Sequence, residues 1–305
     1  MKQPVILFCE DPLQSKKVEP DFEAEYAAAI ENGFETALVN YEELLAGNEQ
    51  DKALKRILYS DVLKEVIYRG WMLTPVKYTA LYNQLLSKNH KLINAPQEYQ
   101  NCHYLPDSLQ YIQDRTPLTI FEKYTGSDSI EAILNRSEIF GKNPVIIKDY
   151  VKSEKHDWDT ACFVKDASDK SKLRETILNF MALRGTFLNE GIVVRKFLAL
   201  NELTIHSKSQ MPLTEEYRLF FYRHQLLGLY DYWEEGVYAF SKPDTKDFEQ
   251  LAAHIGSHFF SMDIARKQNG DFVIIELGDG QVSGLPDALD KNLFYRKLKE
   301  LREDK

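Results

Sequence analysis

The chain has 305 residues, more than one compact core usually holds, which favours two or three lobes with clefts between them. A hydrophobic fraction of 44% and a charged fraction of 28% are those of an ordinary folded protein, and no apolar run approaches membrane-spanning length. A formal net charge of -9 argues against broad binding to nucleic acid, which needs a basic face. The three cysteines lack close spacing and indicate no disulfide framework, so we expect a cytoplasmic protein.

The first third of the chain alternates strand and helix patterns. Strands are predicted at 4–9, 34–40, 62–68 and 91–95, with helices at 21–31 and 75–87, which is the pattern of a βαβ layer. Arg69 follows the third strand, where it either holds an anionic group or is a surface residue. Prolines punctuate the end of this region, so we predict an α/β domain over 1–116 and a second domain over 117–305.

From Leu118 the pattern changes to antiparallel strands with helices between them. We predict strands at 144–151, 158–164 and 190–200, and a hairpin from 216–223 and 225–233. Helices are expected at 170–183, 246–259 and 286–301. The predicted fold class is therefore α/β followed by α+β.

Lys148 lies in an apolar run, where an unpaired ammonium group is costly to bury. A phosphate would satisfy it, and so would a protein carboxylate. The next loop, 152–157, contributes Lys152 and Lys155, which can close over phosphates. It contains no glycine and is therefore not a P-loop.

Two later strands carry further candidates. Arg195 and Lys196 are adjacent, so strand alternation sends them to opposite faces. The backbone at Lys196 and Phe197 is then expected to be free to bond a flat heterocycle. Alternation also places Glu216 and Arg218 on one face of their strand.

Near the carboxyl end, Asn269-Gly270 predicts a two-residue hairpin turn. Gln268 would then pair with Asp271, and counting back along both strands places Asp263 opposite Glu276. The other face of the hairpin would be apolar, so a slipped register would bury both acids. This apolar face consists of Met262, Ile264, Ile275 and Leu277.

Two carboxylates side by side need something to offset their repulsion. At ~5 Å and an effective dielectric of 20, two like charges repel by roughly 3 kcal/mol. One solution is a magnesium ion, which takes carboxylate oxygens completed by water and phosphate. The other is a lysine or arginine from elsewhere in the chain.

The segments VIIKDYV, EGIVVRKF, EYRLFF, LLGLYDYW and MDIARKQNGDFVIIELGDG, in this order, resemble successive strands of the ATP-grasp superfamily. The resemblance covers roughly 117–286 and is greatest to the divergent clade that includes the eukaryotic cell-division-cycle protein assembling translation initiation factor two. It implies two α+β lobes that grip ATP, preceded by a small α/β pre-ATP-grasp domain.

The same resemblance assigns roles to residues. Lys148 and Arg218 would act in catalysis on the phosphates. The third metal ligand of the family is an asparagine whose position is Gly278 here, so Asp279 or Gln281 would have to replace it. The ATP-binding residues implied are Lys148, Lys152, Lys155, Arg195, Lys196, Phe197, Arg218 and Asp231, and the magnesium ligands are Asp263, Glu276 and Asp279.

The implied activity is ATP- and magnesium-dependent ligation through an acyl phosphate. The substrate would be a carboxylate on a small molecule, peptide or protein, and the nucleophile an amine or thiol. Two alternatives remain open at this point: an ATP-binding assembly factor that performs no ligation, and a kinase-like enzyme.

Overall fold

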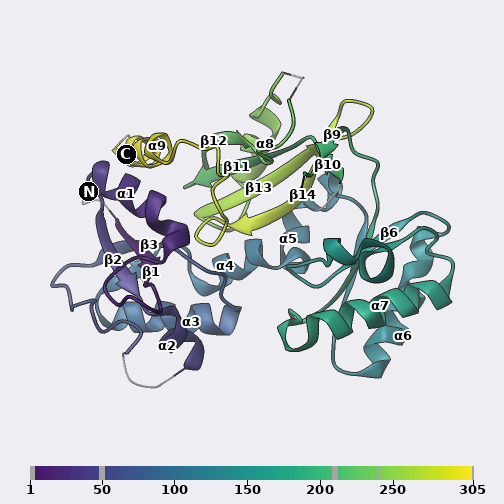
Figure 1. The fold of residues 1–305 in the computed structure, drawn as a ribbon, viewed down its shortest axis with the longest axis horizontal. Coiled ribbons are helices and arrows are strands. Elements are labelled where there is room, and N and C mark those ends of the chain that lie inside the picture. The colour runs from purple at the N-terminus through teal and green to yellow at the C-terminus, as the bar shows by residue number, and fades with distance from the viewer. Residues whose placement is uncertain (1–3, 48–51, 208–211, 239–240, 304–305) are drawn as a thin grey trace.

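A computed structural model describes residues 4–47, 52–207, 212–238 and 241–303 (Figure 1). The amino-terminal part contains a parallel sheet in the order β2-β1-β3-β4. Its strands are β1 (Val5–Cys9), β2 (Glu35–Val39), β3 (Lys64–Arg69) and β4 (His90–Leu92). Its helices are α1 (Glu23–Glu31), α2 (Tyr41–Ala46), α3 (Pro75–Ser87), α4 (Pro96–His103) and α5 (Leu105–Ile112).

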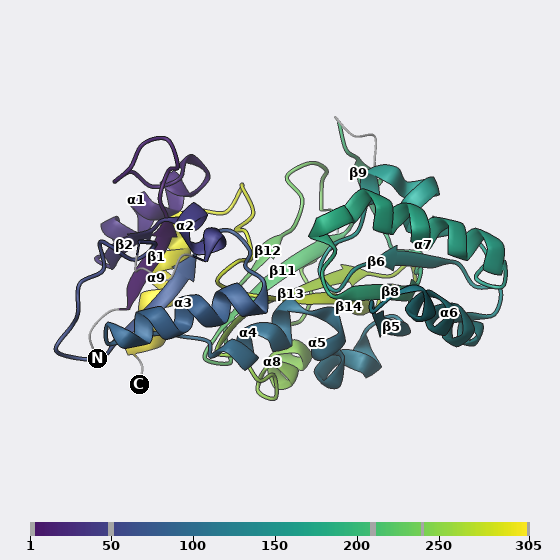
Figure 2. The same cartoon turned by 90° about the horizontal axis from the view of Figure 1, so that it is seen from below.

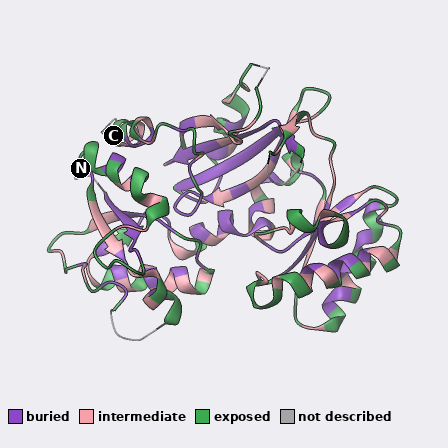
Figure 3. Ribbon diagram, in the orientation of Figure 1, coloured by how far each residue is buried: buried purple, intermediate pink, exposed green. Residues whose placement is uncertain are grey.

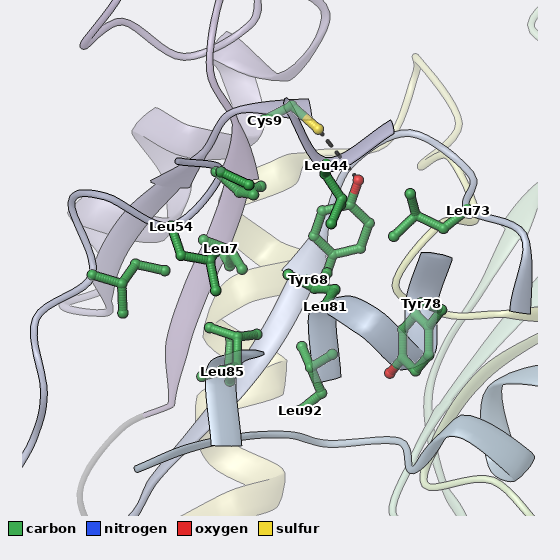
Figure 4. Packing of buried hydrophobic residues seen from close by; sticks show 14 of the residues in the cluster. Leu7, Cys9, Leu44, Leu54, Tyr68, Leu73, Tyr78, Leu81, Leu85 and Leu92 are labelled. Carbon is green, nitrogen blue, oxygen red and sulfur yellow. Dashed lines mark hydrogen bonds between the residues drawn. The ribbon is translucent and has the colours of Figure 1, made fainter. Parts of the chain in front are cut away.

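The pattern of the first strands explains this layer. All five residues of β1 are buried, as expected for a central parallel strand covered on both faces. Helix α3 begins where Thr74 accepts a hydrogen bond from the backbone of Lys77 and Pro75 takes the first helical position. Figure 4 shows how Leu81 of α3 packs with Leu7 and Tyr68 of the sheet.

The second sheet is antiparallel, in the order β5-β8-β6-β7. It consists of β5 (Thr119–Lys123), β6 (Val145–Lys148), β7 (Phe163–Val164) and β8 (Gly191–Lys196). Helices α6 (Ser127–Arg136) and α7 (Lys170–Arg184) pack on it and share its apolar core. This lobe lies on the right in Figure 1.

The third sheet has the order β12-β11-β13-β14 and is also antiparallel. Its strands are β11 (Glu216–Tyr222), β12 (Gln225–Asp231), β13 (Phe259–Arg266) and β14 (Phe272–Asp279). Helices α4, α5 and α8 (Lys246–Ala252) cover one face of it (Figure 2). Most residues of these strands are buried (Figure 3).

The last helix, α9 (Lys291–Glu303), returns to the amino-terminal domain, where Tyr295 packs edge-on against Phe34. Phe294 of the same helix contacts Phe220 of β11, so α9 joins the first and third sheets. The division into 1–116 and 117–305 stays a prediction. The remaining short elements are the strands Glu202–Ile205 (β9) and Pro212–Thr214 (β10), single turns at Pro20–Phe22, Gln113–Arg115, Ser137–Phe140, Lys155–Asp157 and Gly185–Phe187, and a π-helical turn at Trp158–Cys162.

The sequence prediction is wrong at two elements. The expected strand at 158–164 is mostly a π-helical turn, and only Phe163 and Val164 are extended. The amide of Phe163 donates to the carbonyl of Trp158, five residues earlier, which closes a π-type turn. The expected helix at 246–259 ends at Ala252, because the Asn94 side chain accepts hydrogen bonds from the amides of His258 and Phe259 and starts β13.

Arg69 has a structural role and is not a free anion-binding residue. Its side chain is buried, and two of its nitrogens donate to the Glu25 carboxylate at 2.9 Å each. The third nitrogen donates to the carbonyl oxygens of Gly280 and Ser283. Tyr295 of α9 also donates to Glu25. This buried ion pair therefore ties α1, β3, α9 and the segment after β14 together.

Glu25→Ala leaves the Arg69 charge buried without its partner, so we expect it to lower the free energy of unfolding by about 3–5 kcal/mol. Urea denaturation measures this. Glu23→Ala, an exposed glutamate on the same helix, serves as the control and should change stability by no more than about 0.5 kcal/mol. Equal effects of the two substitutions would contradict the role given to Arg69.

Candidate functional site

Asp263 and Glu276 are direct cross-strand partners in the β13–β14 hairpin, as predicted. The predicted turn is wrong, because the Lys267 amide donates to the Asp271 carbonyl at 2.8 Å and leaves a three-residue loop at 268–270. A register shift next to Asp263 compensates for the extra loop residue.

The same shift changes one core residue. Ile264 pairs with Ile274, so Ile275 is the extra residue of a bulge. Ile274, rather than the predicted Ile275, is fully buried with Met262 and Leu277. The apolar face of the hairpin therefore still fixes the two acids on the opposite face.

Each acid pairs with a basic side chain in this structure. Arg218, the cross-strand partner of Asp263 on β11, donates to both of its carboxylate oxygens at 2.8 and 2.7 Å. Lys148, at the end of β6, donates from Nζ to Glu276 at 2.9 Å. The Lys148–Glu276 pair links the second sheet to the third. We call Lys148, Arg218, Asp263 and Glu276 the charge cluster.

The electrostatics of the charge cluster follow from its burial. Burial opposes ionisation of Glu276, but Lys148, Lys155 and Arg218 outweigh it and hold its pKa at about 2. Burial raises the pKa of Asp263, an effect that Arg218 opposes. Burial also disfavours the charge on Arg218, yet Asp263 raises its pKa above the usual range. Glu276 and Arg218 are therefore charged at neutral pH.

The loop at 152–157 brings two more lysines to this place. Burial lowers the pKa of Lys152, and Lys148 lowers it further, while Glu276 opposes the shift. Lys155 is close enough to influence both acids of the cluster. The buried Asp149 carboxylate anchors the loop by accepting hydrogen bonds from the Lys152 amide and from Arg184 at 3.1 Å. These contacts fix where the loop leaves β6.

Arg195 lies beside the cluster, on the strand next to Lys148. One of its terminal nitrogens donates to Thr116 and, at 3.3 Å, to the carbonyl of Ile274 on β14. The side chain is 3% exposed, and its Nε has no hydrogen-bond partner among the described residues. Burial lowers the pKa of Arg195 to about 10. A buried donor without a protein acceptor is uncommon, and either an ordered water or a ligand atom can satisfy it.

The backbone next to Arg195 is less open than predicted. The amide of Lys196 donates to the carbonyl of Leu118 at 2.8 Å, and that of Phe197 donates to Pro144 at 2.9 Å. Both N–H groups are thus used within the protein, so the expectation of a free backbone is wrong for them. The Phe197 ring packs edge-on against Phe163 at 5.2 Å.

A cavity of about 80 Å³ lies at the charge cluster. Two of the residues that line it, His103 and Ser261, were not predicted from the sequence. Ser261 could have been predicted from the sequence, because it precedes Asp263 by two residues and strand alternation puts both side chains on one face. Nothing in the sequence signals His103, which burial and the neighbouring Lys152 keep neutral by lowering its pKa to about 3.

The structure does not bring Asp279 together with the two acids. Strand alternation turns its side chain to the face opposite Glu276. Its carboxylate accepts hydrogen bonds from the Asn94 side chain and from the backbone and side-chain nitrogens of Gln281. Gln281 also donates to the Tyr78 hydroxyl at 2.7 Å. Gly278 lies on the same face as Glu276. A side chain at this position would collide with the Ser283 hydroxyl, because its Cβ would lie 2.6 Å from that oxygen.

Asp231 also lies outside the cluster. It ends β12, where it pairs across the strands with Tyr217 and lies 3.6 Å from the ammonium of Lys242. Its neighbour Tyr232 is closer to the site, because its ring stacks on the Arg218 guanidinium at 4.7 Å.

The donor chemistry suits a hard cation only in part. Asp263 and Glu276 offer neighbouring carboxylate oxygens, which magnesium prefers. Within the described ranges, no three His, Cys, Asp or Glu side chains gather as a metal site. An ion held here would need phosphate oxygens or water to complete its coordination.

One sheet thus presents a lysine to a second sheet that presents two acids and an arginine. Residues 137–298 match the family described as ATP-grasp domain, R2K clade family 3. Because the match covers more than half of the 305 residues, the protein belongs to this family. The predicted ATP-grasp fold is thereby confirmed.

Solved structures with the same fold cover nearly the whole chain. A RimK-domain ATP-grasp protein from Sphaerobacter thermophilus is 13% identical, with a TM-score of 0.56 over 97% of this chain and 98% of that one. The ATP-grasp ligase PsnB, solved with a precursor variant, Mg and ADP, is 12% identical, with a TM-score of 0.57 over 99% of each chain. The D-cycloserine synthetase DcsG is 11% identical, with a TM-score of 0.57 over 97% of this chain and 99% of that one.

No curated protein sequence matches the chain. Among the residues that the structure describes, no helix has both the length and the apolar character required to cross a bilayer.

The buried Asp279 makes a testable contribution to the pH dependence of stability. Burial raises its pKa to about 7, whereas an unfolded aspartate titrates near about 4. The folded protein binds the carboxyl proton of Asp279 more tightly than the unfolded chain does. The contribution of this proton to the unfolding free energy is therefore complete below about pH 4 and is lost as the pH rises to about 7. Relative to Asp279→Asn, the wild type should lose about 3 kcal/mol of unfolding free energy between pH 5 and pH 8.

Denaturation curves at the two pH values measure this difference. The control is Asp271→Asn in the exposed hairpin loop, where hydrogen bonds from Lys267 and Asn269 lower the aspartate pKa and leave nothing to titrate in this range. Parallel pH profiles for the wild type and Asp279→Asn would contradict the prediction.

Proposed function

We propose that the protein is an ATP- and magnesium-dependent ligase that activates a substrate carboxylate as an acyl phosphate and joins it to an amine or thiol. The observation that carries the proposal is the charge cluster, which places two cations and two acids where the second and third sheets meet. The family and the ligases that share the fold support it.

In this proposal the phosphates of ATP lie between the two sheets. Lys148 and Arg218 would turn from the acids to the phosphate oxygens, with Lys152 and Lys155 closing from the loop. Arginine and lysine stabilise the charge that spreads over a phosphoryl group during transfer. Arg195 and the segment at Lys196 and Phe197 would flank the adenine, and the unpartnered Nε of Arg195 supports a nucleotide acceptor there.

Asp263 and Glu276 would hold the magnesium ion, which when bound neutralises phosphate charge. We propose Asp279 as a support of this hairpin rather than as a direct ligand, since both of its oxygens already accept hydrogen bonds. For Asp231, which ends β12 outside the charge cluster, we propose a role in orienting the substrate.

The substrate class follows from the relatives only in outline. The structurally similar proteins include a ligase solved with its precursor peptide and synthetases of small molecules. For this chain we propose a carboxylate on a compound of either kind.

The binding test compares thermal unfolding with and without ATP and magnesium. A nucleotide at 100 times its dissociation constant should stabilise the wild type by about 2.7 kcal/mol. Glu276→Gln and Asp263→Asn should lose most of the magnesium-dependent part of this gain. Asp271→Asn, which removes the same charge from the exposed loop of the same hairpin, should keep it. A wild type that shows no magnesium-dependent stabilisation would contradict the proposal.

The catalytic test separates the alternatives. A ligase releases ADP and phosphate once the matching acid and amine are supplied. An assembly factor binds ATP without turnover, and a kinase yields a stable phosphorylated product without a second nucleophile. Either of these outcomes would overturn the ligase assignment.

A further inference from the structure

A cavity of about 820 Å³ lies at the carboxyl ends of β1 and β3. Glu10 and the segment 70–72 follow these strands, and the chain after β14, residues 281–287, forms the facing wall. Ligands of open α/β sheets bind at this edge, and the volume suits a small molecule. We call this cavity the amino-terminal cleft.

The amino-terminal cleft opens onto the charge cluster. Met72, Lys152, Ser283 and Gly284 line both the cleft and the small cavity beside Asp263 and Glu276. A compound bound in the cleft would therefore reach the place where the proposed acyl phosphate forms. This continuity makes the cleft the candidate site for one of the two substrates.

The acids of the cleft outnumber its available cations. Glu10 pairs with Arg56 at 2.7 Å, and Glu25 pairs with Arg69, so these carboxylates are neutralised. Within the described part of the chain, four other lining carboxylates take part in no ion pair. They are Glu19, Asp21, Glu42 and Asp287.

Two lysines also line the cleft. Lys291 donates to the carbonyl oxygens of Pro286 and Asp287, and Lys152 lies at the boundary with the charge cluster. The wall formed by Glu19, Asp21 and Glu42 is thus negative, and the positive side faces the nucleotide site. Within this wall the acids repel one another: burial and the neighbouring Asp11 and Asp21 raise the pKa of Glu19. A cation bound there would relieve that repulsion.

Aromatic side chains stand next to these acids. Phe22 and Trp71 meet edge-to-face, with ring centroids 5.2 Å apart, and both line the cleft. Tyr41 donates to the carbonyl of Met72 at 2.9 Å and adds a third ring. Carboxylates beside aromatic faces are the surroundings that bind organic ammonium groups.

We propose that the amino-terminal cleft binds the amine substrate, a small compound whose ammonium group is held by Glu19 and Asp21 beside Trp71. This inference rests on the proposed ligase function and names its second substrate. An anionic substrate would be repelled by the same wall, so the carboxylate substrate belongs on the side of Lys152 and Arg218.

The test uses the full chain and two matched pairs of probes, 1,5-diaminopentane with 1,5-pentanediol, and pentylamine with 1-pentanol. Each is titrated in a thermal-shift assay at constant ionic strength. We expect the amine of each pair to raise the melting temperature saturably and its counterpart to have no such effect. Equal responses within each pair, or no response to either amine, would overturn the proposal.

Variants locate the binding. Glu19→Gln with Asp21→Asn should weaken amine binding at least tenfold, whereas Glu23→Gln with Glu31→Gln, which removes two exposed charges from the neighbouring helix outside the cleft, should leave it unchanged. If the first variant does not fold, Glu42→Gln with Asp287→Asn, both exposed, should weaken binding at least threefold. Unchanged affinity in the folded cleft variant would overturn the proposal.

The response to ATP and magnesium is measured on the same proteins. Cleft variants should retain it, because their substitutions lie outside the charge cluster. In the wild type, an absence of amine selectivity together with an intact nucleotide response overturns the cleft assignment alone. Amine selectivity without any nucleotide response counts against the ligase function and leaves the cleft as an amine-binding site.

Discussion

The candidate site depends on two carboxylates that lie side by side where two sheets meet. Asp263 and Glu276 would repel one another by roughly 3 kcal/mol if left alone. Arg218 and Lys148 each neutralise one of them, and the two cations come from different sheets. Removing Glu276 or Arg218 would leave the buried Lys148 or Asp263 without its partner, which is costly. The four residues are therefore best regarded as one electrostatic unit.

The surrounding fold fixes this unit from several directions. The apolar face of the β13–β14 hairpin packs on α4, α5 and α8, so the opposite face must carry the acids. The Asp149 carboxylate holds the loop that follows Lys148. The Arg69–Glu25 pair fastens the segment after β14 to the amino-terminal domain. Side chains from three parts of the chain thus determine the geometry of one site.

Much of this site could be predicted because its signals are local and periodic. Counting back from the predicted hairpin turn paired Asp263 with Glu276, although the turn itself differs, and the apolar run around Lys148 indicated that its ammonium group required an anionic partner. The bulge at Ile275 could not be predicted, since a three-residue loop and a compensating shift give the same pairing at the acids. The turn at Trp158–Cys162 was missed because its apolar run fits a strand equally well.

Contacts between segments that are distant in the sequence could not be predicted, for a different reason. Nothing near Arg69 in the sequence indicates that Glu25 is its partner, and nothing near His103 indicates that it lies beside the acids. The amino-terminal cleft likewise takes one wall from the first strands and the other from the end of the third sheet. Only the packing of the whole chain determines such sites.

The pairing within the charge cluster also bears on how ligands would enter the proposed site. A metal ion alone would have to compete with Lys148 and Arg218 for the acids, and ATP alone would bring phosphates close to two carboxylates. Each ligand removes the obstacle to the other, because phosphates draw the cations away from the acids and the metal neutralises the acids. The two binding events are then coupled, and thermodynamic linkage requires this coupling to be reciprocal. In the proposed site, the ion pairs of the free protein would therefore oppose the binding of either ligand alone and favour the binding of both together.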